Sequence, residues 1–146
     1  MSVLSCPESV LVVIHTPALD CLLLERLNPA GFWQSVTGTL RWRETAAECA
    51  AREVREETGI DSGNYAGGLV DADLVQRFPI LPEWRDRYGP EVTENLEHLW
   101  YLPVPEILPV TLNPDEHLQH RWLPLDKAIS TVTSWTNRAA LEKLRQ

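Results

Sequence analysis

The stretch GTLRWRETAAECAAREVREETGI, Gly38–Ile60, contains a helix whose two ends can both be located. Thr45 and Glu48 have the Thr-x-x-Glu spacing of a capping box, in which each side chain binds a free backbone N–H group at the start of a helix. Gly59 can adopt the left-handed conformation that commonly ends a helix. The stretch therefore predicts a helix from about Thr45 to Thr58.

Three carboxylates lie near the end of this helix, where the helix dipole favours positive charge. Glu53, Glu56 and Glu57 are spaced so that all three reach the same side of the helix. The dipole opposes each charge by roughly 0.3 to 1 kcal/mol, and each like-charged pair costs roughly 0.2 to 0.5 kcal/mol. A divalent cation would reverse both penalties. The alternative is a solvated charged face, in which Arg52 and Arg55 offset part of the repulsion.

The residues upstream decide between these alternatives. The stretch resembles the signature of the Nudix hydrolase family, in which Gly, Glu, Arg-Glu, an aliphatic residue, Glu-Glu, Gly and a second aliphatic residue occupy fixed positions. Those positions hold Gly38, Glu44, Arg52, Glu53, Val54, Glu56, Glu57, Gly59 and Ile60 in this sequence. The resemblance implies an α/β protein with the Nudix fold, an α/β/α sandwich with a mixed sheet. It also implies hydrolysis of a diphosphate that is linked to another group.

Loop and helix together have the chemistry of a clamp for magnesium and pyrophosphate. Gly38 imposes no side-chain obstruction, so its backbone carbonyl can approach a bound ion. Hard ions such as Mg²⁺ bind one or two carboxylates and complete their shell with waters and phosphates. Arg52 can hold a carboxylate in place through its rigid fork. Many family members have Glu and Gly where this chain has Arg41 and Arg43, which would add positive charge beside the phosphates.

Outside the signature, the sequence resembles a bacterial subfamily of folate biosynthesis that acts on 7,8-dihydroneopterin triphosphate. The matching stretches are VLVVI (Val10–Ile14), FWQSVTG (Phe32–Gly38), RYGPEVTEN (Arg87–Asn95) and SWTNRAA (Ser134–Ala140). The resemblance implies hydrolysis of that substrate to the monophosphate and pyrophosphate. The alternatives are a housecleaning hydrolase of dATP or oxidised dGTP, and a Nudix module that senses a nucleotide without cleaving it.

The resemblance also implies roles for individual residues. The expected catalytic residues are Arg52, Glu53, Glu56, Glu57 and Glu116, and the expected ligands of Mg²⁺, or of Mn²⁺ in its place, are Gly38, Glu53, Glu56, Glu57 and Glu116. Glu116 acts as a ligand or as the general base. The expected substrate contacts are Arg26, Thr37, Ser134, Trp135 and a loop of Phe78, Pro79, Ile80 and Leu81. His117 is a candidate for catalysis or for orienting Glu116.

A pterin is a flat ring with a hydrogen-bonding edge, which suits aromatic stacking and polar side chains. The candidates for stacking are Trp33, Trp135 and Phe78. Those for polar contacts are Gln34 and Asn137. Trp100 and Trp122 lie inside strand-like runs and are expected to fill the core.

Apolar runs on both sides of the helix predict strands. These strands span Val10–Ile14, Cys21–Arg26, Leu96–Leu102 and Leu118–Leu125, and FWQSVTG runs into Gly38. A second helix follows Ser134 or Asn137 and continues to the end of the chain. This order predicts a mixed sheet between helical layers.

Composition limits the partners of the protein. A chain of 146 residues with 44% hydrophobic and 23% charged residues predicts one domain, residues 1–146. Its net charge of −8 repels nucleic acid and anionic membranes, and no obligate protein partner is evident. The resemblance implies a small-molecule triphosphate as the partner. Cys6, Cys21 and Cys49 show no paired spacing, so we expect buried free thiols. No leader or long apolar run is evident, which favours a cytoplasmic protein.

Overall fold

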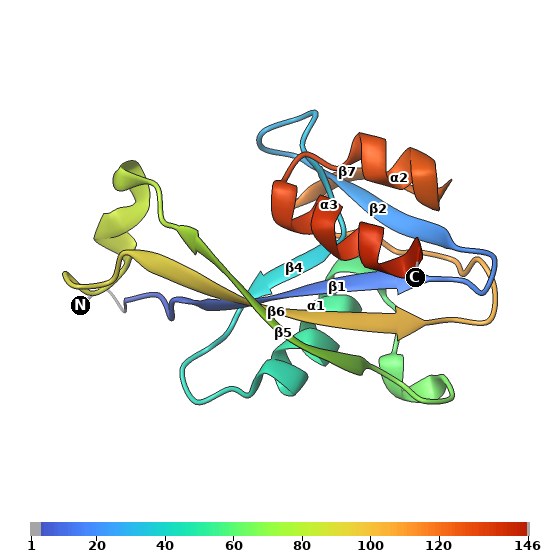
Figure 1. The fold of residues 1–146 in the computed structure, drawn as a ribbon, viewed down its shortest axis with the longest axis horizontal. Coiled ribbons are helices and arrows are strands. Elements are labelled where there is room, and N and C mark those ends of the chain that lie inside the picture. Colours follow the sequence, from blue (N-terminus) through green and yellow to red (C-terminus); the bar gives the residue numbers. More distant parts are fainter. Residues whose placement is uncertain (1–3, 146) are drawn as a thin grey trace.

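The structure of the protein is a computed structural model that describes residues 4–145, so the predicted domain of residues 1–146 extends beyond it at both ends. A seven-stranded mixed sheet lies between α1 (Ala46–Thr58) on one face and α2 (Leu125–Thr131) and α3 (Trp135–Glu142) on the other (Figure 1). The predicted α/β/α sandwich is confirmed. None of the helices in the described part of the chain is long and apolar enough to cross a membrane.

The strands diverge on one side of the central strand, β1 (Glu8–His15). The other edge of β1 pairs in parallel, over all eight of its residues, with Leu96–Pro103 of β6 (Glu94–Pro103). In turn, β6 pairs with β5 (Val70–Pro79) at the edge of the sheet. On the diverging side, β1 pairs with β2 (Asp20–Arg26) only at its last residue. The opening is filled by β3 (Trp33–Gln34), which pairs with β2, and β4 (Val36–Thr39), which pairs with β1. On its outer edge, β2 pairs with β7 (His117–Pro124).

Short 3₁₀ helices complete the connections: Ser62–Asn64, Pro82–Arg87 and Lys143–Arg145. The second of these stands at the far end of the β5–β6 pair, away from α2 (Figure 1). The structure places the three cysteines in the interior as free thiols.

Residues of β1 alternate between two cores. Val10, Val12 and Ile14 pack with α1, whereas Leu11 and Val13 pack with α2 and α3. A strand covered on both faces needs apolar residues at every position, which explains the uninterrupted run VLVVI. The run was predicted to be a strand, and the structure confirms it.

Two elements differ from the sequence expectation. β5 was not predicted, because its exposed face at the sheet edge carries charged residues such as Asp71, Asp73 and Arg77. α2 was also missed, and the predicted strand Leu118–Leu125 ends at Pro124, since Leu125 begins this short helix.

Both predicted ends of α1 are confirmed. The Thr45 hydroxyl accepts the Glu48 backbone N–H at 3.1 Å, and Glu48 Oε1 accepts the Thr45 N–H at 3.0 Å. Gly59 has φ 76° and donates its N–H to the Arg55 carbonyl. The buried face of the helix comprises Cys49, Ala50, Val54, Glu57 and Thr58. A carboxylate therefore stands on the side of α1 that faces the protein.

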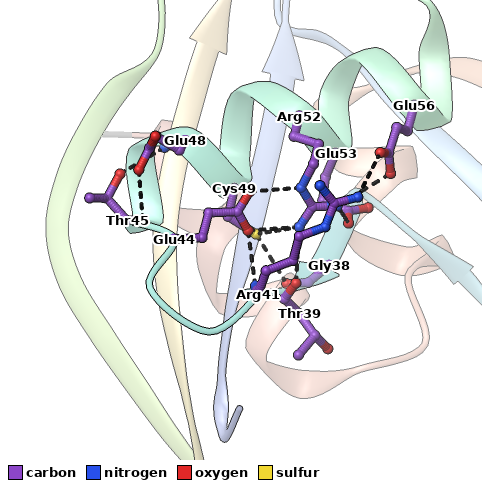
Figure 2. A network of polar contacts seen from close by, with 10 residues as sticks. All are labelled: Gly38, Thr39, Arg41, Glu44, Thr45, Glu48, Cys49, Arg52, Glu53 and Glu56. Carbon is purple, nitrogen blue, oxygen red and sulfur yellow. Dashed lines mark hydrogen bonds and ion pairs between the residues drawn. The ribbon is translucent and has the colours of Figure 1, made fainter. Parts of the chain in front are cut away.

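Arg52 joins α1 to the loop that precedes it (Figure 2). Its Nε and Nη2 donate to the two carboxylate oxygens of Glu44 at 2.7 and 2.8 Å, and Nη2 also reaches the Thr39 carbonyl at 3.1 Å. Its Nη1 donates to Glu53 at 2.6 Å. The Arg52 hydrogen bonds are the main reason that the pKa of Glu44 falls to about 2. One guanidinium thus fixes loop, strand and helix relative to one another.

We predict that Glu44→Gln destabilises the protein in a pH-dependent manner. Because the folded-state pKa of Glu44 is lowered, its contribution is complete above the unfolded-state value of 4.5 and is lost as the pH falls toward about 2. At pH 7 the variant should lose about 2 kcal/mol of unfolding free energy, a typical value for hydrogen bonds to a charged group. Urea unfolding from pH 7 to pH 3 should show the difference from wild type shrinking. A difference that does not depend on pH would contradict the assignment, and the exposed Glu106→Gln is the control.

Candidate active site

Two adjoining cavities open where β3 and β4 meet the end of β2. Their volumes are about 370 Å³ and about 510 Å³. Both are lined by Arg26, Gln34, Thr37 and Gly38, so they form one site with two ends. We call the smaller one the acidic cavity, since Glu53, Glu57, Asp115 and Glu116 line it, and the larger one the aromatic cavity, since Phe32, Phe78, Trp84, Tyr88 and Trp135 line it.

Carboxylates from two segments face the acidic cavity: Glu53 and Glu57 from α1, and Glu116 from the residues just before β7. Glu57 is only 2% exposed, and its Oε1 lies 3.6 Å from His117 Nε2 without a hydrogen-bond partner among the described residues. Burial, followed by the interaction with Glu53, raises the pKa of Glu57 well above its ordinary value. Burial and nearby negative charges raise the pKa of Glu116 in the same way. The fold therefore holds these carboxyl groups close together although burial and mutual repulsion disfavour their charged forms.

Gly38 leaves the space that Glu53 occupies. A Cβ atom at Gly38 would stand 2.2 Å from both Cγ and Cδ of Glu53, far inside the contact distance of carbon atoms. The register places Gly38 opposite Val10, on the face of the sheet that α1 covers. Any side chain at this position would push the Glu53 carboxylate out of the acidic cavity.

The acidic cavity fits a divalent cation by the chemistry of its donors. A hard ion would supply a partner for the orphaned Glu57 oxygen and relieve the repulsion among the carboxylates. Within residues 4–145, no group of three or more His, Cys, Asp or Glu side chains is close enough to hold an ion unaided. In proteins, Mg²⁺ commonly keeps several waters and shares its shell with substrate phosphates.

Two of the expected catalytic residues lie outside the lining of the acidic cavity. Glu56 is exposed and contacts Arg52 Nη1 at 3.3 Å and Arg41 Nη2 at 3.7 Å. Arg52 lies behind Glu53 and orients its carboxylate. Gly38, Glu53, Glu57 and Glu116, by contrast, all line the cavity.

Arg26 is the cation at the junction of the two cavities. Its Nε donates to Gln34 Oε1 at 3.0 Å, and its guanidinium stands 4.3 Å from the centre of the Phe32 ring. These contacts leave a positively charged group facing the carboxylates of the acidic cavity. Burial, followed by the charge of Arg26, lowers the pKa of His117, so this imidazole is neutral at pH 7. A neutral imidazole can accept a proton or orient a neighbouring group, so both roles expected for His117 stay predictions.

All the residues expected to contact substrate line the aromatic cavity: Arg26, Thr37, Phe78, Pro79, Ile80, Leu81, Ser134 and Trp135. Phe78 and Pro79 were expected in a loop, but they are the last two residues of β5, and only Ile80 and Leu81 follow the strand. Ser134 is the N-cap of α3 and accepts the Asn137 N–H, which fixes the position of Trp135 at the cavity mouth.

Several candidates have structural positions instead. Trp33 lies under the Arg121 guanidinium, 5.3 Å from it, and does not line either cavity. Asn137 is buried and bonds both the backbone and the hydroxyl of Ser35. Arg41 and Arg43 are exposed and line neither cavity, and Arg43 has φ 72°, a conformation that suits the Gly of other family members.

The polar floor and much of the aromatic wall of the aromatic cavity were not predicted from the sequence. The missed residues include Ser9, Phe32, Trp84, Tyr88, Asn95 and Glu97. Tyr88 and Asn95 lie within RYGPEVTEN, one of the stretches that carried the resemblance, so that segment held a usable signal. Glu97 lies in a strand and has no local pattern to distinguish it.

Comparisons with known proteins agree with this geometry. The chain is 38% identical over 138 residues to the dihydroneopterin triphosphate diphosphatase of Escherichia coli (strain K12), covering 94% of this chain and 91% of that protein. It is 37% identical over 139 residues to the protein of the same name from Haemophilus influenzae, covering 93% and 85%. The solved structure of the E. coli dihydroneopterin triphosphate pyrophosphohydrolase superposes with a TM-score of 0.85, at 38% identity and over 97% of each chain. Residues 7–144 match the model of the NUDIX domain. The chain therefore belongs to the Nudix family of hydrolases.

Proposed function

We propose that this protein hydrolyses 7,8-dihydroneopterin triphosphate to dihydroneopterin monophosphate and pyrophosphate, with Mg²⁺ as the cofactor. The observation that carries the proposal is the joined site, whose acidic end fits an ion with phosphates and whose aromatic end fits a flat ring. The identity of 38% to the E. coli diphosphatase over nearly the whole chain supports this choice of substrate.

Nudix hydrolases generally use a divalent metal, and we assign its binding here to the acidic cavity. Glu53, Glu57 and the Gly38 carbonyl would hold Mg²⁺, or Mn²⁺ in its place, with Glu116 on the facing side and Glu56 adding negative charge from outside. The ion would neutralise phosphate oxygens and lower the pKa of the attacking water. Arg52 keeps Glu53 turned toward the cavity through its hydrogen bond of 2.6 Å.

The remaining residues of the junction position the phosphates and the water. Arg26 supplies positive charge opposite the carboxylates, where it can bind a phosphate through its fork. Glu116 is less buried than Glu57 and can either accept the proton of the attacking water or bind the ion. The pterin then lies in the aromatic cavity, between Phe78 and Trp135, with Ser134 at its rim.

We predict that Glu57→Gln lowers kcat/KM by about 100-fold or more, because preorganised charge on a transferring phosphoryl group commonly contributes that much. The neutral amide should leave the fold intact, since burial already disfavours the charged carboxylate. Pyrophosphate release and thermal unfolding would be measured on the same preparation. Glu56→Gln should lose less activity, because its carboxylate is exposed and outside the cavity, and Glu106→Gln should lose none. Full activity of Glu57→Gln would rule out the metal site.

We also predict that Gly38→Ala folds but needs far more metal. The three atoms nearest to the added methyl group all belong to the Glu53 side chain, so we expect this side chain to move and the backbone to stay. The Mg²⁺ concentration for half-maximal rate should rise about 10-fold or more, in the range seen when ligand orientation is disturbed. Metal titrations of activity on wild type and variant would test this, and an unchanged requirement would contradict it.

The choice of substrate predicts a preference for the pterin over nucleotides. Dihydroneopterin triphosphate should exceed each nucleoside triphosphate by about tenfold or more in kcat/KM, which corresponds to about 1.4 kcal/mol of transition-state preference. The measurement is pyrophosphate release with Mg²⁺ over a panel that includes dATP and oxidised dGTP. Preference for one of these nucleotides would replace the proposed function with that of a housecleaning hydrolase.

A further inference from the structure

A polar row crosses the sheet beneath the aromatic cavity. Thr39 of β4 is opposite Ser9 of β1, Ser9 is opposite Glu97 of β6, and Glu97 is opposite Gln76 of β5. Residues opposite one another in a sheet project from the same face. Leu99, two residues from Glu97 on that face, is buried in the core with α2 and α3. The apolar core therefore gives way to polar side chains where the aromatic cavity begins.

Glu97 is the charged member of this row and lacks a full set of partners. It is 7% exposed, lines the aromatic cavity, and its Oε1 has no hydrogen-bond partner among the described residues. Burial raises the pKa of Glu97, an effect that the Thr136 side chain only partly opposes. Beside it, the buried Oε1 of Gln76 is also without a partner in the described part of the chain. Gln76 does not line the cavity, so its floor presents one carboxylate oxygen, Glu97 Oε1, for which the described residues supply no donor.

Neighbouring groups do not neutralise Glu97. Asn95 Nδ2 donates to the Ser9 hydroxyl at 2.8 Å, and Gln76 Nε2 lies 3.5 Å from the Thr136 carbonyl. Glu97 belongs to none of the ion pairs formed by residues 4–145. Buried carboxylates are costly without donors, so a ligand that brings two N–H groups would remove the cost.

We propose that Glu97 determines ring specificity by binding the donor edge of a 2-amino-4-oxo pyrimidine ring, the edge that pterins and guanines share. This edge carries a ring N–H beside an exocyclic amine, two parallel donors that match the two oxygens of one carboxylate. Adenine presents a ring nitrogen lone pair at the equivalent place, which the carboxylate would repel. The inference rests on the proposed function for its location and deepens it by assigning the recognised edge.

The test measures ring binding separately from hydrolysis. GMP, IMP and AMP contain no diphosphate bond, so their dissociation constants can be measured with Mg²⁺ present and without turnover. IMP lacks only the exocyclic amine, and AMP lacks the ring N–H as well. Trp84 and Trp135 line the aromatic cavity, so tryptophan fluorescence can report binding, with calorimetry as a second method.

Wild type should bind GMP about tenfold or more tightly than IMP, the range for a hydrogen bond to a charged group, and AMP still more weakly. Glu97→Gln offers one acceptor in place of two and should bring the ratio of GMP to IMP close to one. Glu94→Gln, an exposed position on the same strand, should keep the wild-type ratio. Thermal unfolding of Glu97→Gln should match or exceed that of wild type, because the substitution removes a buried charge.

The outcomes separate this inference from the proposed function. A ratio near one in wild type, or a ratio that Glu97→Gln leaves unchanged, would overturn the role of Glu97, even if the pterin triphosphate is hydrolysed. A preference for GMP over IMP that Glu97→Gln removes would support the role of Glu97. If such a protein hydrolysed GTP better than the pterin triphosphate, only the substrate assignment would fail. Equal weakening of GMP, IMP and AMP by Glu97→Gln would show a structural role alone and would also overturn the inference.

Discussion

The bidentate ion pair between Arg52 and Glu44 is the interaction on which the geometry of the site depends. Two parallel hydrogen bonds of 2.7 and 2.8 Å fix the loop before α1 to the middle of that helix, and a third reaches the Thr39 carbonyl of β4. Because β4 carries Gly38 and α1 carries Glu53, the same guanidinium determines how closely these two residues approach. Bidentate pairs of this kind combine binding energy with a defined orientation, which a single charge such as that of Lys cannot give.

This anchor explains how the protein tolerates so much negative charge on one helix. Arg52 contacts Glu44, Glu53 and Glu56, so it offsets repulsion on the exposed side of α1. It forms no hydrogen bond or ion pair with Glu57, which is buried and keeps one oxygen without a hydrogen-bond partner among residues 4–145. The remaining strain is therefore concentrated at the cavity, where an ion and phosphates can relieve it. Functional sites commonly retain such locally unfavourable arrangements at a cost in stability.

The parts of the structure that could be predicted from the sequence are those determined by residues close together in the chain. The caps of α1 depend on Thr45, Glu48 and Gly59, and helical spacing alone brings Glu53 and Glu57 to one side. The burial of Glu57 could not be predicted in this way, because the spacing of apolar residues along the helix does not show that Glu57 faces the protein interior. β5 was not predicted because its exposed face is charged. The position of Glu97 in the polar row depends on the register of four strands. Register across a sheet is a long-range property, which no local pattern contains.

The same contrast separates the two ends of the site. The acidic cavity takes Gly38, Glu53 and Glu57 from one continuous stretch of the chain. The aromatic cavity is assembled from β1 to β6, the 3₁₀ helix Pro82–Arg87 and the start of α3. Only the residues at the junction belong to both. Substitutions on the floor or wall of the aromatic cavity can therefore alter which ring is accepted without moving the carboxylates that would hold the ion. A fold built this way can keep one reaction while its substrate changes, and for this reason the short signature identifies the chemistry but the strand register is needed to understand the substrate.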